Sequence, residues 1–522
     1  TLVPVSPGES EKSLKRRAEV YLHNLPDTAV LSEEYDLSSF LADWLGSYGP
    51  VRKQEVQHLL GVTPERLDEA IEPLIEAQSV IMDRFGEESA ELEICDTRNL
   101  EMLLRMARRY RQPAFEALPR GHLVLFLAAF QGVIPRGESR EDLQQRLEQL
   151  FGWPAPADEW EEHLLPSRMR QYRSEWLDGL MGSSDLIWFG CGRRRISLAF
   201  ASDLELFRTD HEPDQAGDAG DLEHLIPDRR GRFSFFEIAE RSHLDTERAT
   251  ELLWKEAWKG NVTSDSFRPV RRGVLTGFKA AVFREEPRLA SRRSGFNRWN
   301  ASRPVEGHWL RIDAPPRQRD ILEDEELAKD RARQVLRRYG VIFRELLANE
   351  LPSLRWRAIF RSLRLMEMSG EVLSGYFFEG IRGPQFISPD ALRMLREPLP
   401  QDAVFWISAI DPVSLCGLAL ESSQGLPSRI PSNQLVYHGT RLVMISRRLG
   451  RSLDIFVDPD DAGLPDYFGM FKELLSREFN PPRKVTVETI NGQTAGSSPY
   501  AGALRQIGFR SSRNVLELWK EY

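Results

Sequence analysis

Two carboxylates near the C-terminus have the setting that hydrolytic chemistry requires. Asp411 follows a predicted buried strand and precedes Pro412, so its side chain is fixed at a strand end. Glu517 lies in the last predicted strand. A carboxylate held in this way can bind an attacking water and stabilise developing positive charge. An aspartate in a turn also commonly accepts hydrogen bonds from backbone amides, and this is the interpretation that we favour for Asp411.

Two arginine clusters could bind phosphates. The first lies in the sequence CGRRR, at the tip of a predicted hairpin, and comprises Arg193, Arg194 and Arg195. The second lies on one face of a predicted helix and comprises Arg357, Arg361 and Arg364. Guanidinium groups in such places contact the phosphate backbone or the minor groove of nucleic acids. A solvated turn explains the first cluster equally well, and a protein partner or solvent would also suit the second.

The second cluster belongs to the most informative stretch of the chain, residues 338–392. Pro352 and Ser353 precede a helix whose apolar residues recur at helical spacing, and Gly370 ends that helix. Two β-rich runs with glycines between them follow. A helix–turn–helix followed by a two-stranded ribbon is typical of a winged helix.

The same succession of helices and a hairpin recurs along the chain. We predict an α+β multidomain protein in which tandem winged helices precede a small C-terminal β-barrel-like domain. The predicted winged helices span residues 36–98, 121–202, 203–275 and 321–397. The other predicted parts are a lead-in (1–35), a connecting helix (99–120), a basic linker (276–320) and the barrel-like domain (398–522).

The first predicted winged helix is unsuited to reading DNA. Its third helix carries a series of acidic side chains: Glu65, Asp68, Glu69, Glu72 and Glu76. A helix that enters a groove should not present this much negative charge to the phosphates. We therefore expect this module to be structural or to bind protein.

The composition is typical of folded modules. The chain has 522 residues, of which 41% are hydrophobic and 29% charged, enough for several globular domains. No run approaches the ~20 apolar residues that span a bilayer, and no signal-peptide pattern opens the chain. The net charge of −9 argues against non-specific coating of nucleic acid. The three scattered cysteines favour a reducing cytoplasm.

The motifs of several cofactor sites are missing from the sequence. No G-x-x-x-x-G-K-[ST] run occurs, and no G-x-G-x-x-G run opens a helix after a strand. There is neither an H-E-x-x-H run nor a pair of C-x-x-C runs, so a zinc site has no support. We therefore expect no cofactor in this segment and no ATP-driven motor.

Several stretches resemble, in order and spacing, the C-terminal region of the large helicase-related (Lhr) family of bacterial superfamily 2 helicases. ELLWKEAWKGNVTSDSFRPVR, residues 251–271, is similar to a tryptophan-rich block of that family, with Ser264 where an asparagine is usual. SAIDPVSLCGL, residues 408–418, is similar to another, with Ser414 in place of asparagine. The remaining similar blocks are residues 161–192, 307–312, 337–345 and 375–386. The likeness covers most of residues 120–522.

This resemblance implies a longer protein with an ATP-dependent helicase core upstream, where ATP and magnesium would bind. The chain does not begin with Met, which agrees with a fragment. The segment itself would serve homo-oligomerisation and nucleic-acid binding in DNA repair. The expected partners are DNA, single-stranded or duplex, and further copies of the chain. No membrane is expected, and the expected location is cytoplasmic and nucleoid-associated.

The layout of winged helices plus a barrel is also similar to that of AlkZ-like DNA glycosylases. The Lhr C-terminal region has been linked to base excision, including excision of uracil. The alternative function is therefore a monofunctional DNA glycosylase, which rotates a base out of the helix. It would need a carboxylate or amide to hold water, and Asp411 and Glu517 are the candidates.

Overall fold

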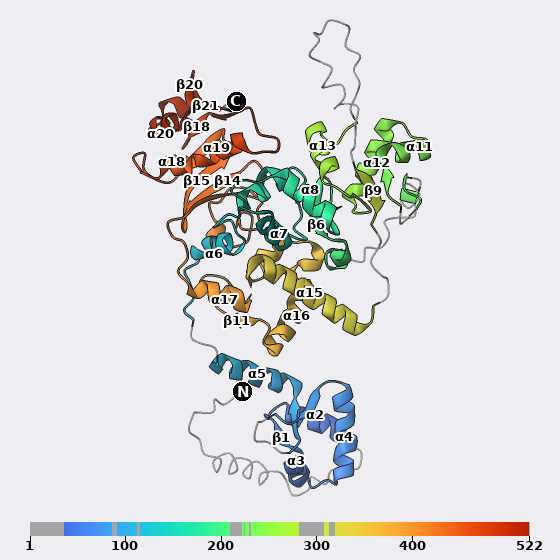
Figure 1. Ribbon diagram of the computed structural model, residues 1–522. Helices are drawn as coiled ribbons and strands as arrows, with labels where there is room; N and C mark the ends of the chain where they lie inside the picture. The colour runs from blue at the N-terminus through green and yellow to red at the C-terminus, as the bar shows by residue number, and fades with distance from the viewer. Residues whose placement is uncertain are drawn as a thin grey trace. The chain divides into compact units, whose positions relative to one another are not determined.

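The computed structural model describes residues 36–85, 91–111, 115–208, 222–223, 225–228, 231–280, 307–312 and 319–520 (Figure 1). The predicted lead-in and most of the basic linker lie outside these residues. The chain divides into two compact units, Thr1–Ala114 and Phe115–Tyr522. No helix in the described ranges is both long and apolar enough to cross a membrane.

The first unit is a winged helix with its own core. Its elements are α2 (Leu37–Leu45), β1 (Val51–Arg52), α3 (Lys53–Leu60), α4 (Pro64–Glu76), β2 (Val80–Asp83), β3 (Glu93–Asp96) and α5 (Thr97–Arg111). The strands pair in the order β1-β3-β2. Thr63 accepts a hydrogen bond from the Arg66 amide and Pro64 is the first helical residue, so local sequence fixes the start of α4.

The second winged helix opens the second unit. Its elements are α6 (His122–Phe130), α7 (Arg140–Gln149), β4 (Ala155–Pro156), a π-helical turn (Trp160–Leu164), a 3-10 turn (Pro166–Arg168), α8 (Ser174–Ser183), β5 (Leu186–Gly190) and β6 (Arg195–Phe200). Helix α6 is apolar on nearly all sides and almost wholly buried. A capping box at Ser139 and Asp142 begins α7. The segment before Pro166 forms the π-helical turn.

The third winged helix recruits a strand from beyond its predicted end. Its elements are α9 (Leu204–Phe207), β7 (Phe233–Ser234), α11 (Phe235–Arg241), α12 (Thr246–Trp258), β8 (Val262–Ser264), α13 (Arg268–Thr276) and β9 (His308–Arg311). Strand β9 lies between β7 and β8, although residues 276–320 were predicted as a linker. The fully buried Trp309 explains this pairing, because its indole fills the space between the sheet and α12.

The fourth winged helix contains the arginine-bearing helix. Its elements are α15 (Ile321–Tyr339), β10 (Val341–Ile342), α16 (Trp356–Ser369), β11 (Leu373–Gly375), β12 (Gln385–Ile387) and α17 (Pro389–Arg396). A 3-10 turn, Pro352–Leu354, precedes α16, and Gly370 ends that helix with a left-handed φ of 81°. The three strands pair in the order β10-β12-β11.

The C-terminal region contains the predicted short strands, but they form open sheets. Its strands are β13 (Val404–Ser408), β14 (Gln434–His438), β15 (Arg441–Arg447), β16 (Ser452–Ile455), β17 (Lys484–Val487), β18 (Thr489–Ile490), β19 (Gln493–Thr494), β20 (Arg510–Ser512) and β21 (Val515–Trp519). One sheet has the order β13-β14-β15-β16-β18-β19, and a separate sheet has the order β17-β21-β20. Within residues 398–520 no closed barrel is found, since β13 and β19 are not paired.

Three helices accompany these strands: α18 (Leu464–Tyr467), α19 (Gly469–Ser476) and α20 (Ala501–Gln506). One continuous core joins the second, third and fourth winged helices to the first strands of the C-terminal region. A second cluster of buried residues fills the rest of that region. In Figure 1 the second winged helix lies between the third winged helix and the C-terminal strands, so its loops face both neighbours.

Candidate functional site

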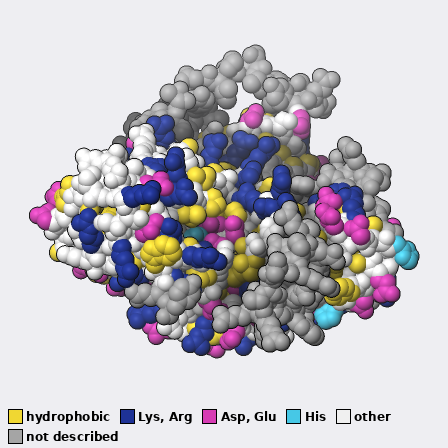
Figure 2. Space-filling view, turned by 90° about the horizontal axis from the view of Figure 1, so that it is seen from above, with side chains coloured by type: hydrophobic (Ala, Val, Ile, Leu, Met, Phe, Trp, Pro, Cys, Tyr) yellow, Lys and Arg dark blue, Asp and Glu magenta, His cyan; other side chains and the backbone are white. Residues whose placement is uncertain are grey.

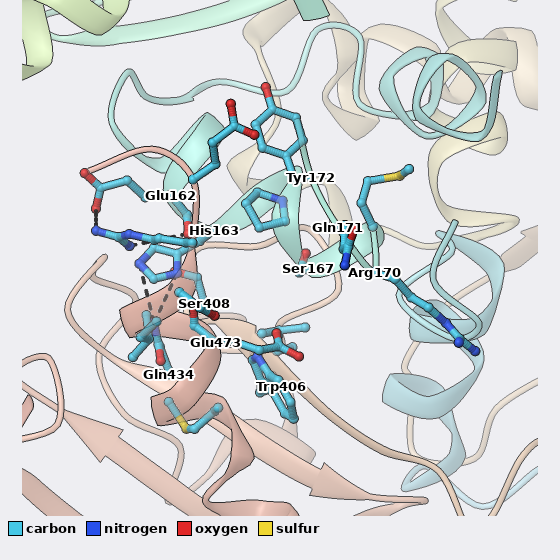
Figure 3. A pocket seen from close by; sticks show the side chains of 18 of the residues that line it. Glu162, His163, Ser167, Arg170, Gln171, Tyr172, Trp406, Ser408, Gln434 and Glu473 are labelled. Carbon is cyan, nitrogen blue, oxygen red and sulfur yellow. Dashed lines mark hydrogen bonds and ion pairs between the residues drawn. The ribbon is translucent and has the colours of Figure 1, made fainter. Parts of the chain in front are cut away.

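A polar cleft lies between the second winged helix and the C-terminal region. It has a volume of about 480 Å³. Its walls come from parts of residues 162–173, from residues 406–408 on β13, from Gln434 on β14, and from residues 470–478 in and after α19. Figure 3 shows His163 and Gln434 facing one another from the two sides of this cleft.

The π-helical turn Trp160–Leu164 aims three consecutive polar side chains in different directions. Glu161 is buried and points to the third winged helix, where it meets Arg271. Glu162 and His163 line the cleft. Single π-helical turns are rare and often occur at functional sites.

Glu162 is the most enclosed carboxylate that lines the cleft. Its side chain is 14% exposed, whereas that of Glu473 on the opposite wall is 46% exposed. Arg477 Nη2 and Asn480 Nδ2 each donate to one oxygen of Glu162, both at 2.7 Å. Burial raises the pKa of Glu162, and the charge of Arg477 opposes that shift. Each carboxylate oxygen has two acceptor sites, so the group can still bind a water or substrate.

His163 is an uncharged partner of Gln434. Gln434 Nε2 lies 3.1 Å from His163 Nδ1. Burial lowers the pKa of His163 to about 3, so the ring is neutral and can accept this hydrogen bond. Glu159 Oε1 lies 4.0 Å from His163 Nε2, and the Ser408 hydroxyl donates to Glu159 Oε2 at 3.1 Å. Burial also raises the pKa of Glu159 well above its ordinary value.

A second network anchors the cleft to the third winged helix. Arg271 on α13 donates to both oxygens of Glu161, at 2.6 and 2.8 Å, and to both oxygens of Asp178, at 2.8 Å each. The buried Tyr172 hydroxyl donates to Glu161. Burial opposes the charge on Arg271, but the bonds to Glu161 and Asp178 outweigh it and raise the pKa of this guanidinium. Tyr172 is thereby held in place where it lines the cleft.

Trp406 supplies the aromatic surface of the cleft. The guanidinium of Arg136 lies 4.7 Å from the centre of its ring. Arg136 is itself held by Glu473 on α19, through bonds of 2.8 and 2.7 Å. Helix α19 and the second winged helix therefore hold the cleft at a fixed width.

These groups suit the hydrolysis of a polar, planar ligand. The cleft combines a partly desolvated carboxylate, a side-chain amide, a neutral imidazole and an aromatic ring. Among the described residues no group of three or more His, Cys, Asp or Glu side chains is placed to hold a metal ion. The described lining residues also include no lysine, so the cleft offers no amine nucleophile.

Asp411, a predicted catalytic acid, lies behind the cleft wall in a buried ion pair. Arg168 Nη1 and Nη2 donate to its two oxygens at 2.8 and 3.0 Å, and neither side chain is more than 1% exposed. The Val413 amide also donates to Asp411 Oδ1 at 2.9 Å, as expected of a turn-forming aspartate. Asp411 does not line the cleft. A catalytic role for it stays a prediction.

Glu517, the other predicted acid, lies on β21 away from the cleft. It pairs with Lys484 on β17 at 2.6 Å. Its side chain is 15% exposed, and it is not among the residues that line the cleft. The structure therefore does not bring Glu517 and Asp411 into one site.

The first arginine cluster lies at the β5–β6 turn, as predicted. Arg193 and Arg194 line a second hollow, between the second and third winged helices. Arg194 donates to the Gly277 carbonyl at 2.8 Å, and Arg195 donates to the Pro154 carbonyl at 2.8 Å. All three side chains are exposed despite these bonds.

The second arginine cluster lies on α16. Arg357 and Arg361 are exposed, whereas Arg364 is half-buried. Arg361 Nη2 donates to Glu325 on α15 at 2.8 Å, which neutralises part of this face. Phosphate binding by these residues stays a prediction.

The residues that line the cleft were not identified from sequence. Glu162 and Gln434 belong to parts of the chain that only the folded structure brings together. The adjacent acids before Pro166, in EEHLLP, were the one local signal available. That signal resembles an ordinary charged helix, because nothing local shows that the helix opens into a π-helical turn.

The fold defines a tandem winged-helix protein. Residues 119–201 and residues 322–406 each match a family model described as the winged-helix domain of the large helicase-related protein. These matches support the resemblance to the C-terminal region of the Lhr family that the sequence motifs indicated.

Two relatives are similar over most of this chain. The "Lhr helicase/uracil glycosylase" of Escherichia coli K12 is 25% identical over 557 aligned residues, covering 96% of this chain and 34% of the relative. The "Lhr helicase/ probable uracil glycosylase" of Mycolicibacterium smegmatis is 25% identical over 482 residues, covering 87% of this chain and 31% of the relative. The chain thus spans about a third of the length of these proteins.

Among solved structures, the DNA glycosylase AlkZ of Streptomyces sahachiroi aligns with 66% of this chain and 92% of its own. The sequence identity is 13% and the TM-score 0.40, which is too low to establish a shared fold.

Proposed function

We propose that this chain is a DNA-binding repair module that excises uracil as a monofunctional glycosylase in the cleft beside Glu162. The observation that carries this proposal is the enclosed carboxylate of Glu162 in a polar cleft with Trp406 and Gln434. Both similar relatives carry uracil glycosylase in their names, which supports the same assignment.

The cleft offers the groups that base excision needs. A base turned out of DNA, at a cost of a few kcal/mol, would contact Trp406 and form hydrogen bonds with Gln434 and Ser408. Glu162 would hold a water beside the sugar and stabilise the positive charge that develops on it. The C1′–N1 bond then breaks, uracil leaves with the bonding electrons, water oxygen bonds to C1′, and its proton passes to Glu162.

The residues that line the cleft favour water, and not an amine, as the nucleophile. A glycosylase that uses an amine forms a covalent imine with the sugar and then cleaves the strand. The described cleft residues include no lysine. We therefore expect the product to be an abasic site in an intact strand.

The experiment is excision of uracil from end-labelled single- and double-stranded oligonucleotides, followed by alkali. The wild-type chain in excess should give breaks only after alkali. Glu162→Gln should lower the single-turnover rate at least ~100-fold while leaving binding to the oligonucleotide within about twofold. The exposed Glu397→Gln is the matched control and should be unchanged. No alkali-sensitive breaks with the wild-type chain would rule out the glycosylase.

Homo-oligomerisation is the second candidate function, favoured by the surface of the first unit. Exposed apolar side chains there are Phe40, Tyr48, Leu59, Ile75, Ile81, Leu92, Met102, Leu103 and Met106. In the proposed oligomer, some of these side chains would be buried between copies of the chain. Light scattering should give an oligomer that Ile81→Glu with Met106→Glu weakens and the control Ile321→Glu does not. A monomeric wild-type chain at micromolar concentration would contradict this.

A helicase core upstream, with its ATP and magnesium, is likewise part of the proposal. The relatives are about three times longer than this chain and carry helicase in their names. An upstream motor would deliver unwound DNA to the module described here.

A further inference from the structure

A second hollow lies between the second and third winged helices. It has a volume of about 800 Å³. Its walls are the β5–β6 turn (residues 189–194), one side of α12 (residues 251–259), residues 277–279 after α13, and the segments at 207–208 and 351–352. We call this hollow the inter-wing groove. It is separate from the cleft beside Glu162, with which it shares no lining residue.

The inter-wing groove is strongly basic although the chain is acidic. Its basic lining residues are Arg193, Arg194, Arg208, Lys255, Lys259 and Lys279. Glu251 is its one acidic lining residue among those described, and Arg248 donates to it at 2.7 Å. In the view from above, Lys and Arg side chains gather around the middle of the molecular face (Figure 2). A net charge of −9 therefore coexists with a surface that attracts polyanions.

An aromatic cluster lies beside these cations. Trp254 and Trp258 stack with their ring centres 5.0 Å apart, and Phe278 meets them edge-on at 4.9 and 4.8 Å. Trp254 is buried, whereas Trp258 and Phe278 are half-buried and keep part of their surface in the groove. The guanidinium of Arg194 lies 5.5 Å from the Phe278 ring centre. Cations beside partly exposed rings are typical of sites that bind single-stranded nucleic acid.

The groove is held together by backbone contacts between the two winged helices. The Gly192 amide donates to the Trp258 carbonyl at 3.0 Å, and Arg194 reaches the Gly277 carbonyl from the other side. Gly190 packs so closely on α12 that a Cβ there would lie 1.9 Å from the Ala257 carbonyl oxygen. The basic turn is therefore fixed on the aromatic cluster, and binding needs little rearrangement.

We propose that the inter-wing groove binds single-stranded DNA, with phosphates on Arg193, Lys255 and Lys279 and a base against Trp258 and Phe278. The rings favour a single strand over a duplex, because a duplex keeps its base faces stacked and out of reach. They also favour nucleic acid over an acidic peptide, which would use the cations alone. This proposal needs no glycosylase activity and is tested with DNA that contains no uracil.

The test of the cations is the salt dependence of binding. Anisotropy of a labelled oligothymidylate gives log K against log [NaCl] for the wild-type chain and for a triple variant, Arg193→Ala, Lys255→Ala and Lys279→Ala. Three lost phosphate contacts should lower the slope by about 2 and weaken binding roughly tenfold or more at 100 mM salt. The matched control removes three exposed arginines elsewhere, Arg393→Ala, Arg483→Ala and Arg510→Ala.

The outcomes distinguish DNA binding in the inter-wing groove from a general electrostatic attraction of DNA to the protein surface. A slope that falls in the groove variant but not in the control supports the proposal. An unchanged slope, or an equal fall in both variants, overturns it. A duplex that binds as tightly as the single strand, with the same loss in the variant, overturns the assignment to single strands.

The test of the aromatic contact is photocrosslinking. An oligonucleotide carrying 5-iodouracil in place of one thymine should crosslink to Trp258 or Phe278, as read by mass spectrometry of the peptides. Crosslinks confined to other regions would overturn the stacking. A chain that binds and crosslinks in this groove but releases no uracil would keep this inference and lose the glycosylase, so the two failures are distinguishable.

Discussion

Arg168 and Asp411, which are 243 residues apart in the sequence, form a fully buried, bidentate ion pair. Both residues adjoin the cleft wall, because Ser167 and Met169 flank Arg168 and Ser408 lies three residues before Asp411. Arg168 also donates to the Leu164 carbonyl at 2.9 Å and to Gln131 at 3.0 Å. The pair therefore holds the second winged helix against the segment that follows β13.

Removing one charge of this pair should be costly. Asp411→Asn leaves a guanidinium unpaired in the interior, so we expect the free energy of unfolding to fall by roughly 3–5 kcal/mol. The double variant Arg168→Met with Asp411→Asn should recover part of the loss, since no buried charge remains unpaired. Urea unfolding of the four proteins in this cycle measures the coupling.

The control for that cycle is the other predicted acid. Glu517→Gln breaks a more exposed pair with Lys484 and should cost less than about 1 kcal/mol. If Asp411→Asn kept the stability of the wild type yet abolished uracil excision, Asp411 would be the catalytic acid that the sequence suggested. A positioning role requires that stability and activity fall together.

Local signals predicted the elements well. Pro64 with Thr63, and Gly370, mark helix ends in the sequence and in the structure. The turn role of Asp411 was also visible, because its bond to the Val413 amide depends on neighbouring residues only. The succession of helices and a hairpin predicted winged helices, and the family models confirm this at residues 119–201 and 322–406.

What the sequence could not show depends on distant segments. Strand β9 pairs with β7 and β8 across a long stretch of sequence, and its Trp309 packs against Trp254 on α12. Sheet closure depends on the pairing of the edge strands, and short alternating runs predict strands without predicting that pairing. The cleft beside Glu162 needs groups from four separated segments, and no spacing in the sequence links them.

The pH dependence of the excision rate should follow the ionisation of Glu162. Burial raises the pKa of this carboxyl above its ordinary 4.5, and the proposed mechanism needs the ionised form. The single-turnover rate should therefore fall as the pH drops through a midpoint above 4.5. His163, whose pKa burial lowers to about 3, should add no step near 6.5. The measurement is the rate of uracil release between pH 4 and 8.

The Glu162→Gln variant is the reference for that profile. Its residual rate should lack the acidic limb, because the titrating group is gone. An acidic limb that persists in this variant, or a wild-type midpoint at or below 4.5, would assign the limb to another group.

His163 should make stability depend on pH. The unfolded ring binds a proton below about 6.5, whereas burial keeps the folded ring neutral down to about 3. The stability that the neutral ring contributes is thus present above pH 6.5 and is lost as the pH falls toward 3. One such histidine lowers the free energy of unfolding by about 1.4 kcal/mol between pH 7.5 and pH 5.5.

The buried glutamates change the pH dependence of stability in the opposite direction. The contribution of His163 is therefore measured as the difference between the wild type and a His163 variant. Burial raises the pKa of Glu159 well above its usual value, and a raised pKa adds stability as the pH falls. Urea unfolding of the wild type and of His163→Gln at both pH values isolates the histidine. His58→Gln, at an exposed site in the first unit, should keep the wild-type dependence. An equal dependence in the wild type and His163→Gln would show that His163 is solvated.

The last prediction concerns DNA binding by the exposed arginines of α16. Arg357 and Arg361 are exposed and adjacent on this helix, so replacing both with alanine should weaken DNA binding and lower its salt dependence by about two phosphate contacts. Glu325 holds Arg361 at 2.8 Å in the free protein. Glu325→Gln should therefore strengthen binding slightly, because Arg361 no longer has to leave a charged partner. If the double variant keeps the wild-type salt slope, α16 does not contact DNA, and its arginines serve only the surface of the fourth winged helix.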